Sequence, residues 1–167
     1  MIQNILPPII NKKARVLIVG SMPGVQSLEK QQYYGNPRNH FWTIIGNVLD
    51  VEIPVVYEER LRVLQQHCIA LWDVIKECER VGSLDSNIKA EVPNDFMSML
   101  DRYPNIEAIA FNGTKARETF RKKIGFVQFP HIAFYQLPSS SPVPGRNIKT
   151  VEQKIESWRV IEPHLKG

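Results

Sequence analysis

The stretch RVLIVG, residues 15–20, decides the fold class, because it is a continuous apolar run that ends at a glycine. Its β-branched residues lack the polar–apolar alternation of a half-exposed strand, which is typical of a strand buried on both faces. Three further apolar runs predict strands of the same kind, at residues 68–74, 106–111 and 132–137.

Amphipathic stretches separate these runs and predict five helices, at residues 40–49, 57–66, 95–103, 114–123 and 150–161. We expect Thr114 to cap the fourth helix and the last helix to end ahead of Pro163. Strands that alternate with helices indicate crossover connections and a parallel sheet covered on both faces. The sequence therefore predicts an α/β fold, and no linker or repeat divides residues 1–167, so we expect one domain.

Composition narrows the classes of function. The net charge of +4 suits a polyanionic partner without requiring one. The two cysteines, Cys68 and Cys78, form no CxxC pair, so we expect no structural zinc, no iron–sulfur cluster and no disulfide scaffold. No apolar run is long enough for a membrane span, and residues 1–13 do not resemble a signal peptide. The prediction is an intracellular, cytoplasmic protein without a metal or other cofactor.

Polar clusters follow three of the predicted strands, at residues 21–27, 112–113 and 139–147. In a parallel α/β sheet, ligands bind beyond the carboxyl ends of the strands. We therefore expect the three clusters to meet at one cleft, although this argument does not say what the cleft holds.

The first cluster contains the turn GSMPG, residues 20–24, which includes Ser21 and Met22. A Gly–Pro–Gly turn allows backbone N–H groups to face a ligand without obstruction by side chains. The alternative is a plain strand-to-helix turn, which the segment alone favours. The turn lacks the GK[ST] ending of a Walker loop, the GxGxxG fingerprint and the G-x-S-x-G pattern of a nucleophile elbow.

The segment QYYGNPRNHFW, residues 32–42, is unusually aromatic for a loop. Phe41 and Trp42 are predicted to form the buried face of the next helix. Tyr34 could stack on a base and Arg38 could meet a phosphate. Asn39 is either a functional amide or the N-cap of the helix, and the sequence leaves both roles open.

Polar side chains also end the later strands. Asn112 would be costly at the end of an apolar strand unless it found partners, but Asn-Gly is also a routine turn. The loop LPSSSPVPGR, residues 137–146, offers hydroxyl and backbone donors for a phosphate, and its alternative is a solvated loop. Val143 between two prolines could enter a base stack. Asp73 could be a base, but a surface or capping role is expected for it.

Three motifs in this order resemble the uracil-DNA glycosylase superfamily, and within it the sixth family, the hypoxanthine-DNA glycosylases. They are GSMPGVQSLEKQQYYGNPRNHFW at residues 20–42, FNG at 111–113 and LPSSSPVPGRN at 137–147. The resemblance covers nearly the whole chain, and the first motif is also similar to that of mismatch-specific uracil/thymine glycosylases. It implies a three-layer α/β/α fold with a four-stranded parallel sheet and a DNA groove along the strand ends.

The resemblance also implies roles for single residues. Tyr34 would stack on the flipped base, Asn112 would contact the base edge, and Asn39 would be the essential catalytic amide. Ser141 would hold the DNA backbone and Val143 would enter the base stack. The remaining site predictions are the base-pocket residues Ser21, Met22 and Ser139 and the DNA-contacting residues Arg38, Ser140 and Arg146.

Two positions depart from other families of the superfamily. Met22 stands where those families carry the Asp or Asn that handles the attacking water, and Ser139 stands where they carry His or Asn. The hypoxanthine family relies instead on the amide that corresponds to Asn39.

The predicted function is a monofunctional DNA glycosylase of base excision repair, acting as a monomer on double-stranded DNA. It would flip out a deaminated base, hypoxanthine or uracil, and hydrolyse its N-glycosidic bond. The alternatives are a broad uracil or mismatch glycosylase and a non-catalytic nucleic-acid-binding domain. A third is a small hydrolase that acts on a free nucleoside.

Overall fold

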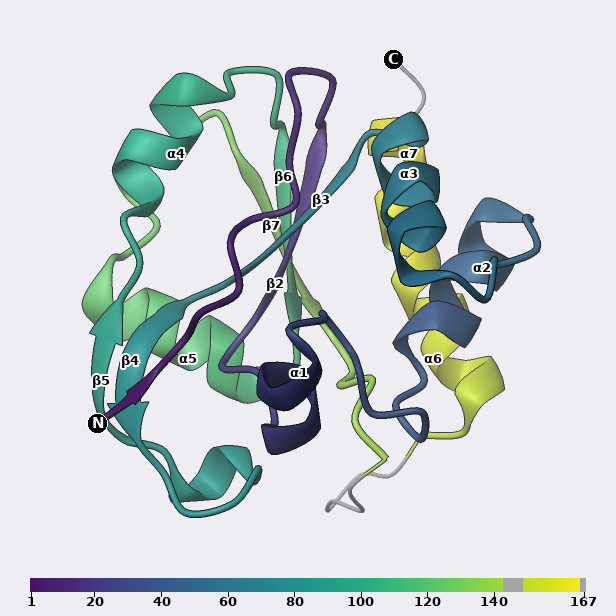
Figure 1. Cartoon of the computed structure of the whole chain (residues 1–167). Helices are drawn as coiled ribbons and strands as arrows, with labels where there is room; N and C mark the ends of the chain where they lie inside the picture. The colour runs from purple at the N-terminus through teal and green to yellow at the C-terminus, as the bar shows by residue number, and fades with distance from the viewer. Residues whose placement is uncertain (143–148, 166–167) are drawn as a thin grey trace.

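A four-stranded parallel sheet forms the centre of the computed structural model, which describes residues 1–142 and 149–165 (Figure 1). The strand order is β3-β2-β6-β7, and each neighbouring pair is parallel. The bounds are β2 Val16–Gly20, β3 Ile69–Asp73, β6 Ala108–Asn112 and β7 Ala133–Leu137. The predicted α/β fold with a four-stranded parallel sheet is thus confirmed.

Helices cover both faces of this sheet (Figure 1). They are α1 Val25–Lys30, α2 Phe41–Leu49, α3 Tyr57–Gln66, α4 Phe96–Arg102, α5 Thr114–Lys123, α6 Val151–Trp158 and α7 Glu162–Leu165. Successive residues of a strand point to opposite faces. Leu17 of β2 therefore packs in the core under α4 and α5, whereas Ile18 packs in the core under α2, α3 and α6. Phe120 and Trp158 are fully buried in these two cores, and replacing either by alanine would cost about 3–5 kcal/mol.

A second, smaller sheet was not predicted from the sequence. It is antiparallel, in the order β1-β4-β5, with bounds β1 Ile2–Gln3, β4 Ile75–Glu79 and β5 Lys89–Pro93. Only Val74 separates β3 from β4, so the chain passes directly from the central sheet into the small one. The connection between β4 and β5 carries a short 3₁₀ turn, Asp85–Asn87.

The helices differ from the predictions in three details, the first of which is that α1 was not predicted. Thr114 does not cap α5: it is the first helical residue, and Gly113 holds the N-cap position with φ of 94°. A positive φ suits glycine, which explains why the cap is shifted by one residue. The last helix is also divided, because a 3₁₀ turn, Arg159–Ile161, follows α6 and the helical path continues through Pro163 in α7. Thr150 caps α6 in a capping box with Gln153.

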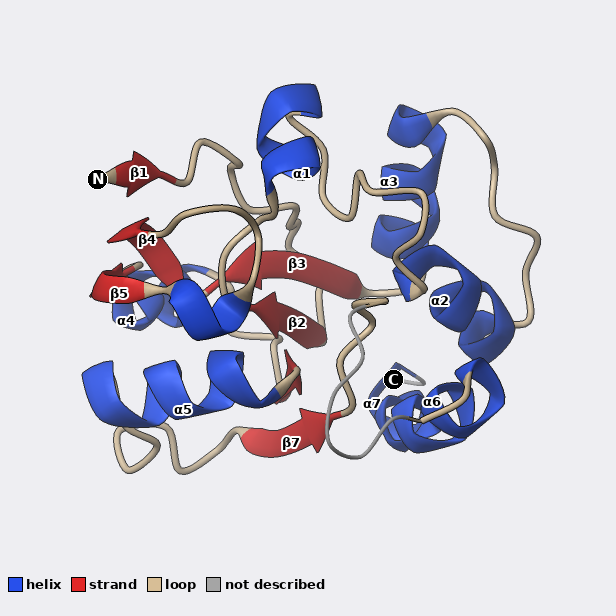
Figure 2. Cartoon of the chain, turned by 90° about the horizontal axis from the view of Figure 1, so that it is seen from below, coloured by secondary structure: helices blue, strands red, loops and turns tan. Residues whose placement is uncertain are grey.

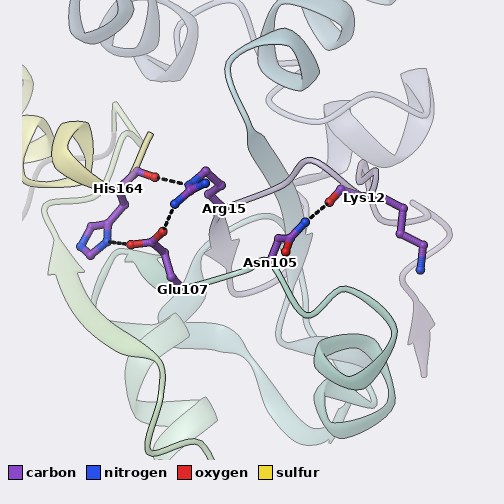
Figure 3. A network of polar contacts seen from close by, with 5 residues as sticks. All are labelled: Lys12, Arg15, Asn105, Glu107 and His164. Carbon is purple, nitrogen blue, oxygen red and sulfur yellow. Dashed lines mark hydrogen bonds and ion pairs between the residues drawn. The ribbon is translucent and has the colours of Figure 1, made fainter. Parts of the chain in front are cut away.

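The amino ends of the strands are closed by a polar network that holds the C-terminal segment (Figure 3). Glu107 accepts hydrogen bonds from Arg15 and from His164, each at 2.7 Å, and the Nε of Arg15 donates to the carbonyl of His164 at 3.0 Å. These contacts leave the opposite, carboxyl edge of the sheet for ligands. None of the helices described is long and apolar enough to cross a membrane.

Candidate active site

A cavity of about 420 Å³ lies at the carboxyl ends of β2, β3 and β6. Figure 2 looks onto this end of the molecule, where α1 and the loops after the strands gather. The cavity brings together eight residues predicted from the sequence: Ser21, Met22, Tyr34, Asn39, Asn112, Ser139, Ser140 and Ser141. Arg38 is exposed and does not line it, and Val143 and Arg146 lie outside the described residues. A second hollow of about 460 Å³, beside α2, contains none of the predicted site residues.

The turn after β2 forms one wall of the cavity. Arg80 holds this turn in position, because its guanidinium donates a hydrogen bond to the carbonyl of Pro23 at 2.6 Å. The hydroxyl of Ser21 donates to the carboxylate of Asp85 at 2.7 Å. Within the described part of the chain, the N–H groups of Met22 and Gly24 find no acceptor. The turn can therefore offer backbone donors to a ligand.

Tyr34 supplies a rigid aromatic wall. Its backbone has a φ of 54°, which is rare for tyrosine and marks a constrained loop. The ring stacks on Phe41, with centroids 3.8 Å apart and planes 10° apart. Burial, with the nearby charge of Asp73, raises the pKa of the hydroxyl, so it stays neutral at ordinary pH.

Asn112 is a cross-link between segments. Its Oδ1 accepts from the N–H of Ser140 at 2.9 Å, while its Nδ2 donates to the Tyr34 hydroxyl at 3.1 Å and to the Ser140 hydroxyl at 2.9 Å. All of the hydrogen-bonding groups of the amide are engaged, apart from a second lone pair on the oxygen. A direct contact between this side chain and a ligand would therefore require one of these bonds to be exchanged.

The N-cap of α2 is His40, so Asn39, a candidate cap in the sequence, lies one residue before the cap position. Its Oδ1 nevertheless accepts from the N–H of Phe41, the first residue of the helix, at 2.9 Å. Its Nδ2 has no acceptor among the residues described, and Asn39 lines the cavity. The next residue, His40, donates its N–H to the carbonyl of Ser140, which ties the start of α2 to the loop after β7. Asn39 thus offers the cavity a hydrogen-bond donor.

Asp73 is the main site residue that sequence reasoning misplaced. The expected surface or capping role is wrong, because Asp73 is 5% exposed and lines the cavity. Asn4 donates to its Oδ2 at 3.1 Å, and a Cβ on Gly20 would lie only 2.6 Å from its Oδ1. Burial raises the pKa of Asp73 to about 7; the charge of Asp85 adds to this rise, whereas the Asn4 hydrogen bond and Arg80 oppose it.

The sequence contains only a weak indication that Asp73 is buried. Asp73 is the register partner of Gly20 in the parallel pair, and Gly20 ends the most strongly apolar run of the sequence. A further wall, formed by Ser83, Leu84, Asp85 and Ser86, had no sequence signal at all. No cluster of three or more His, Cys, Asp or Glu side chains suited to a metal ion occurs within residues 1–142 and 149–165.

Comparisons with known proteins agree with this geometry. Residues 7–162 match the model of the family described as the Uracil DNA glycosylase superfamily. A Methanosarcina acetivorans protein named hypoxanthine DNA glycosylase is 36% identical over 165 residues, which are 98% of this chain and 100% of that protein. A protein of the same name from Methanosarcina barkeri is 41% identical over 113 residues, which are 67% of this chain and 72% of that protein. The solution NMR structure of a Methanosarcina acetivorans protein, 35% identical, aligns with a TM-score of 0.81 over 97% of both chains.

Proposed function

Because the chain belongs to the uracil DNA glycosylase superfamily, we propose that it is a monofunctional DNA glycosylase that removes hypoxanthine from deoxyinosine in duplex DNA. The two Methanosarcina relatives carry the name of that activity. The enzyme would act in base excision repair, as a single domain and a monomer in the cytoplasm, and it would leave an abasic site. Uracil is the second substrate we expect.

Base flipping explains why a small cavity serves this reaction. A glycosylase must take the target nucleotide out of the stack, and this costs least at a mispaired base. The cavity of about 420 Å³ is in the size range of small-molecule sites. Its wall at Tyr34 is held in place by the stack on Phe41, so a flipped base would meet a preformed aromatic surface.

The single observation that carries the proposal is the free donor of Asn39. When the bond from the base to the sugar breaks, positive charge develops on the sugar and negative charge on the base. One fixed donor aimed at such charge in a dry site contributes about 3 kcal/mol. Because Oδ1 of Asn39 already accepts from the N–H of Phe41, we assign its Nδ2 to the departing base rather than its oxygen to the attacking water.

Two further donors support this assignment. Met22 and Gly24 line the same cavity as Asn39, and their backbone N–H groups have no acceptor in the described part of the chain. Met22 cannot activate a water, so we propose that these donors stabilise the departing base while a water attacks a nearly formed sugar cation. Such a dissociative mechanism needs no general base.

Hydrogen bonding at the base edge separates the two deaminated bases from their parent bases, adenine and cytosine. Hypoxanthine and uracil both present an N–H beside a carbonyl, whereas adenine and cytosine present the reverse pattern. A normal adenine or cytosine in the cavity would leave buried donors without acceptors, and such mismatches are strongly rejected.

DNA contacts would come from the serine-rich loop and from Arg38. Ser140 is buried and hydrogen-bonded to Asn112, so it holds its neighbours Ser139 and Ser141 in the lining of the cavity. Backbone and hydroxyl groups of this kind hold phosphates. Arg38 is exposed and directly precedes Asn39, which lines the cavity, so it suits a second phosphate. The contacts of Val143 and Arg146 with DNA stay predictions.

The experiment is a cleavage assay in EDTA. Purified protein is incubated with labelled duplexes that contain one deoxyinosine, one deoxyuridine or no damaged base, and alkali then cuts any abasic site. We expect cleavage at deoxyinosine and none in the undamaged duplex. Cleavage at deoxyuridine alone would indicate a uracil or mismatch enzyme, and binding without any cleavage would indicate a nucleic-acid-binding domain.

A further inference from the structure

We propose that Asp73 is the general acid of this reaction, and that its carboxyl group protonates N7 of the purine as the glycosidic bond breaks. The inference rests on the proposed function, since it assigns a proton donor to the same cavity. It adds a chemical reason for a purine substrate.

The geometry places an unused carboxyl oxygen at the cavity. Asp73 ends β3, at the same edge of the sheet as the turn after β2 and Asn112, and it lines the cavity with them. Its Oδ2 is held by Asn4, but no donor among the described residues reaches its Oδ1. Glycine at position 20 leaves the room that this oxygen needs. No lysine or arginine among the described residues forms an ion pair with it.

The surroundings favour a protonated carboxyl group. From the other elements, the charged and titratable groups near Asp73 are Asp85, Arg80, Tyr33 and Tyr34. The two tyrosines stay neutral because burial raises the pKa of each. Burial raises the pKa of Asp73 to about 7, so at neutral pH a large share of the molecules carries the proton. A general acid works best when its pKa lies near the working pH.

The step balances as an assisted hydrolysis. The C1′–N9 bond breaks and its electron pair stays on the base, while the proton on Oδ1 of Asp73 moves to N7. The base then leaves as neutral hypoxanthine and not as an anion. Water adds to C1′ of the sugar cation and loses a proton to solvent, and the Asp73 carboxylate regains a proton from solvent.

This role separates purines from pyrimidines. Hypoxanthine has a ring nitrogen, N7, with a free lone pair that accepts a proton. Uracil has no such nitrogen once its N1 is bound to the sugar, because N3 carries a hydrogen. A proton donor at this position therefore assists hypoxanthine more than uracil.

The test compares the wild type with Asp73→Asn and Asp85→Asn by single-turnover cleavage of three duplexes over a range of pH on both sides of 7. The duplexes contain deoxyinosine, deoxyuridine or 7-deaza-deoxyinosine, which lacks the nitrogen at N7. Asparagine keeps an oxygen that accepts from Asn4, so Asp73→Asn removes the proton and little else. Thermal unfolding and DNA binding verify that each variant is folded.

We expect the wild-type rate on deoxyinosine to fall as the pH rises through about 7. Asp73→Asn should lower that rate by about 10²–10⁴-fold, abolish the fall, and affect deoxyuridine by a clearly smaller factor. Asp85→Asn should move the fall to lower pH, because it removes a negative charge that disfavours ionised Asp73. On 7-deaza-deoxyinosine the wild type and Asp73→Asn should be equally slow.

Four results would overturn the inference. One is an unchanged rate and pH profile in Asp73→Asn, which leaves the proposed function intact. The second is an equal loss on deoxyinosine and deoxyuridine, which indicates a structural role. If Asp73→Asn does not fold, a wild type whose pH profile on deoxyinosine matches that on deoxyuridine overturns it. A wild type that never cuts deoxyinosine overturns the proposed function together with the inference.

Discussion

Asn112 and Tyr34 lie 78 residues apart in the sequence, and a hydrogen bond of 3.1 Å joins the amide of one to the hydroxyl of the other. The same amide bonds twice to Ser140, once to its N–H and once to its hydroxyl. One side chain at the end of β6 thus ties the loop before α2 to the loop after β7. The aromatic wall and the serine-rich wall of the cavity are therefore held in one fixed relation.

We expect Asn112→Ala to lower both stability and cleavage. The substitution leaves the buried N–H of Ser140 without its acceptor, and such an orphan costs about 1–3 kcal/mol. Urea unfolding measures the stability and the single-turnover rate on deoxyinosine measures the cleavage. Tyr34→Phe is the matched control, because it removes only one partner of the amide and keeps the ring on Phe41. Equal losses in the two variants would show that the Ser140 bonds do not matter.

Two substitutions of Asn39 should separate its hydrogen bond to Phe41 from its role in catalysis. Asn39→Asp keeps an oxygen for the N–H of Phe41 but loses the amide nitrogen, which has no acceptor in the described part of the chain. We expect a folded protein whose cleavage rate falls by about 10²–10³-fold, the cost of one transition-state donor. Asn39→Ala should lose as much activity and also about 1 kcal/mol of stability, because the hydrogen bond to the N–H of Phe41 is gone. An active Asn39→Asp enzyme would refute the donor role.

Much of the central sheet could be predicted because a strand that is buried on both faces appears in the sequence as a continuous apolar run. The run RVLIVG has no polar residue between Val16 and Gly20, and all five residues of β2 are buried. The strands of the small sheet contain no such apolar run. Charged residues occupy three of the five positions of β4, IKECE, and β5 is mostly exposed, so both stretches resemble surface chain.

The candidate site was predictable where it depends on strand ends, and unpredictable where it depends on the small sheet. The turn after β2, Asn112 and the serines after β7 meet because parallel strands end at one edge. The wall at Ser83–Ser86 arises from the connection between β4 and β5, whose path no local pattern encodes. The burial of Asp73 has the same origin. Asn4 of the N-terminal segment donates hydrogen bonds both to Asp73 and to the carbonyl of Ile75 in β4.

Lys154 is a buried charge at the edge of the site, and we expect it to serve DNA binding at a cost in stability. It is 7% exposed, its Nζ contacts the His40 ring at 3.2 Å and the carbonyl of Ser141 at 3.3 Å, and no carboxylate in the described part of the chain pairs with it. Desolvation lowers the pKa of Lys154, as expected for an uncompensated ammonium group. A phosphate near the Ser141 loop would compensate its charge.

Lys154→Met should therefore unfold at a higher temperature than the wild type and bind duplex DNA more weakly. The slope of log affinity against log salt should decrease by about 1, the change expected for one lost phosphate contact. Lys13→Met is the control, because Lys13 is exposed near the amino ends of the strands. If both variants change the salt dependence equally, only net charge matters and the local role of Lys154 is wrong.

Asp73 should make the protein less stable as the pH rises. Its pKa in the folded state, about 7, lies above its ordinary value of 3.8, so between these values the folded protein binds more protons than the unfolded chain. The free energy of unfolding then falls with rising pH across this interval, and the loss is complete above about pH 7. Asp73→Asn cannot ionise. It should match the wild type near pH 4 and exceed it above neutrality by about 2–4 kcal/mol in urea unfolding.

Asp95→Asn is the control, because the contribution of Asp95 to stability should depend on pH in the opposite direction. Hydrogen bonds from Ser98 lower the pKa of Asp95 at the start of α4, so its contribution is present at neutral pH and is lost as the pH falls. The variant should be slightly less stable than the wild type at neutral pH and equal to it in acid. If Asp73→Asn instead destabilises the protein at neutral pH, the ionised carboxylate is a structural partner of its neighbours. The cavity would then hold an anion where we infer a proton.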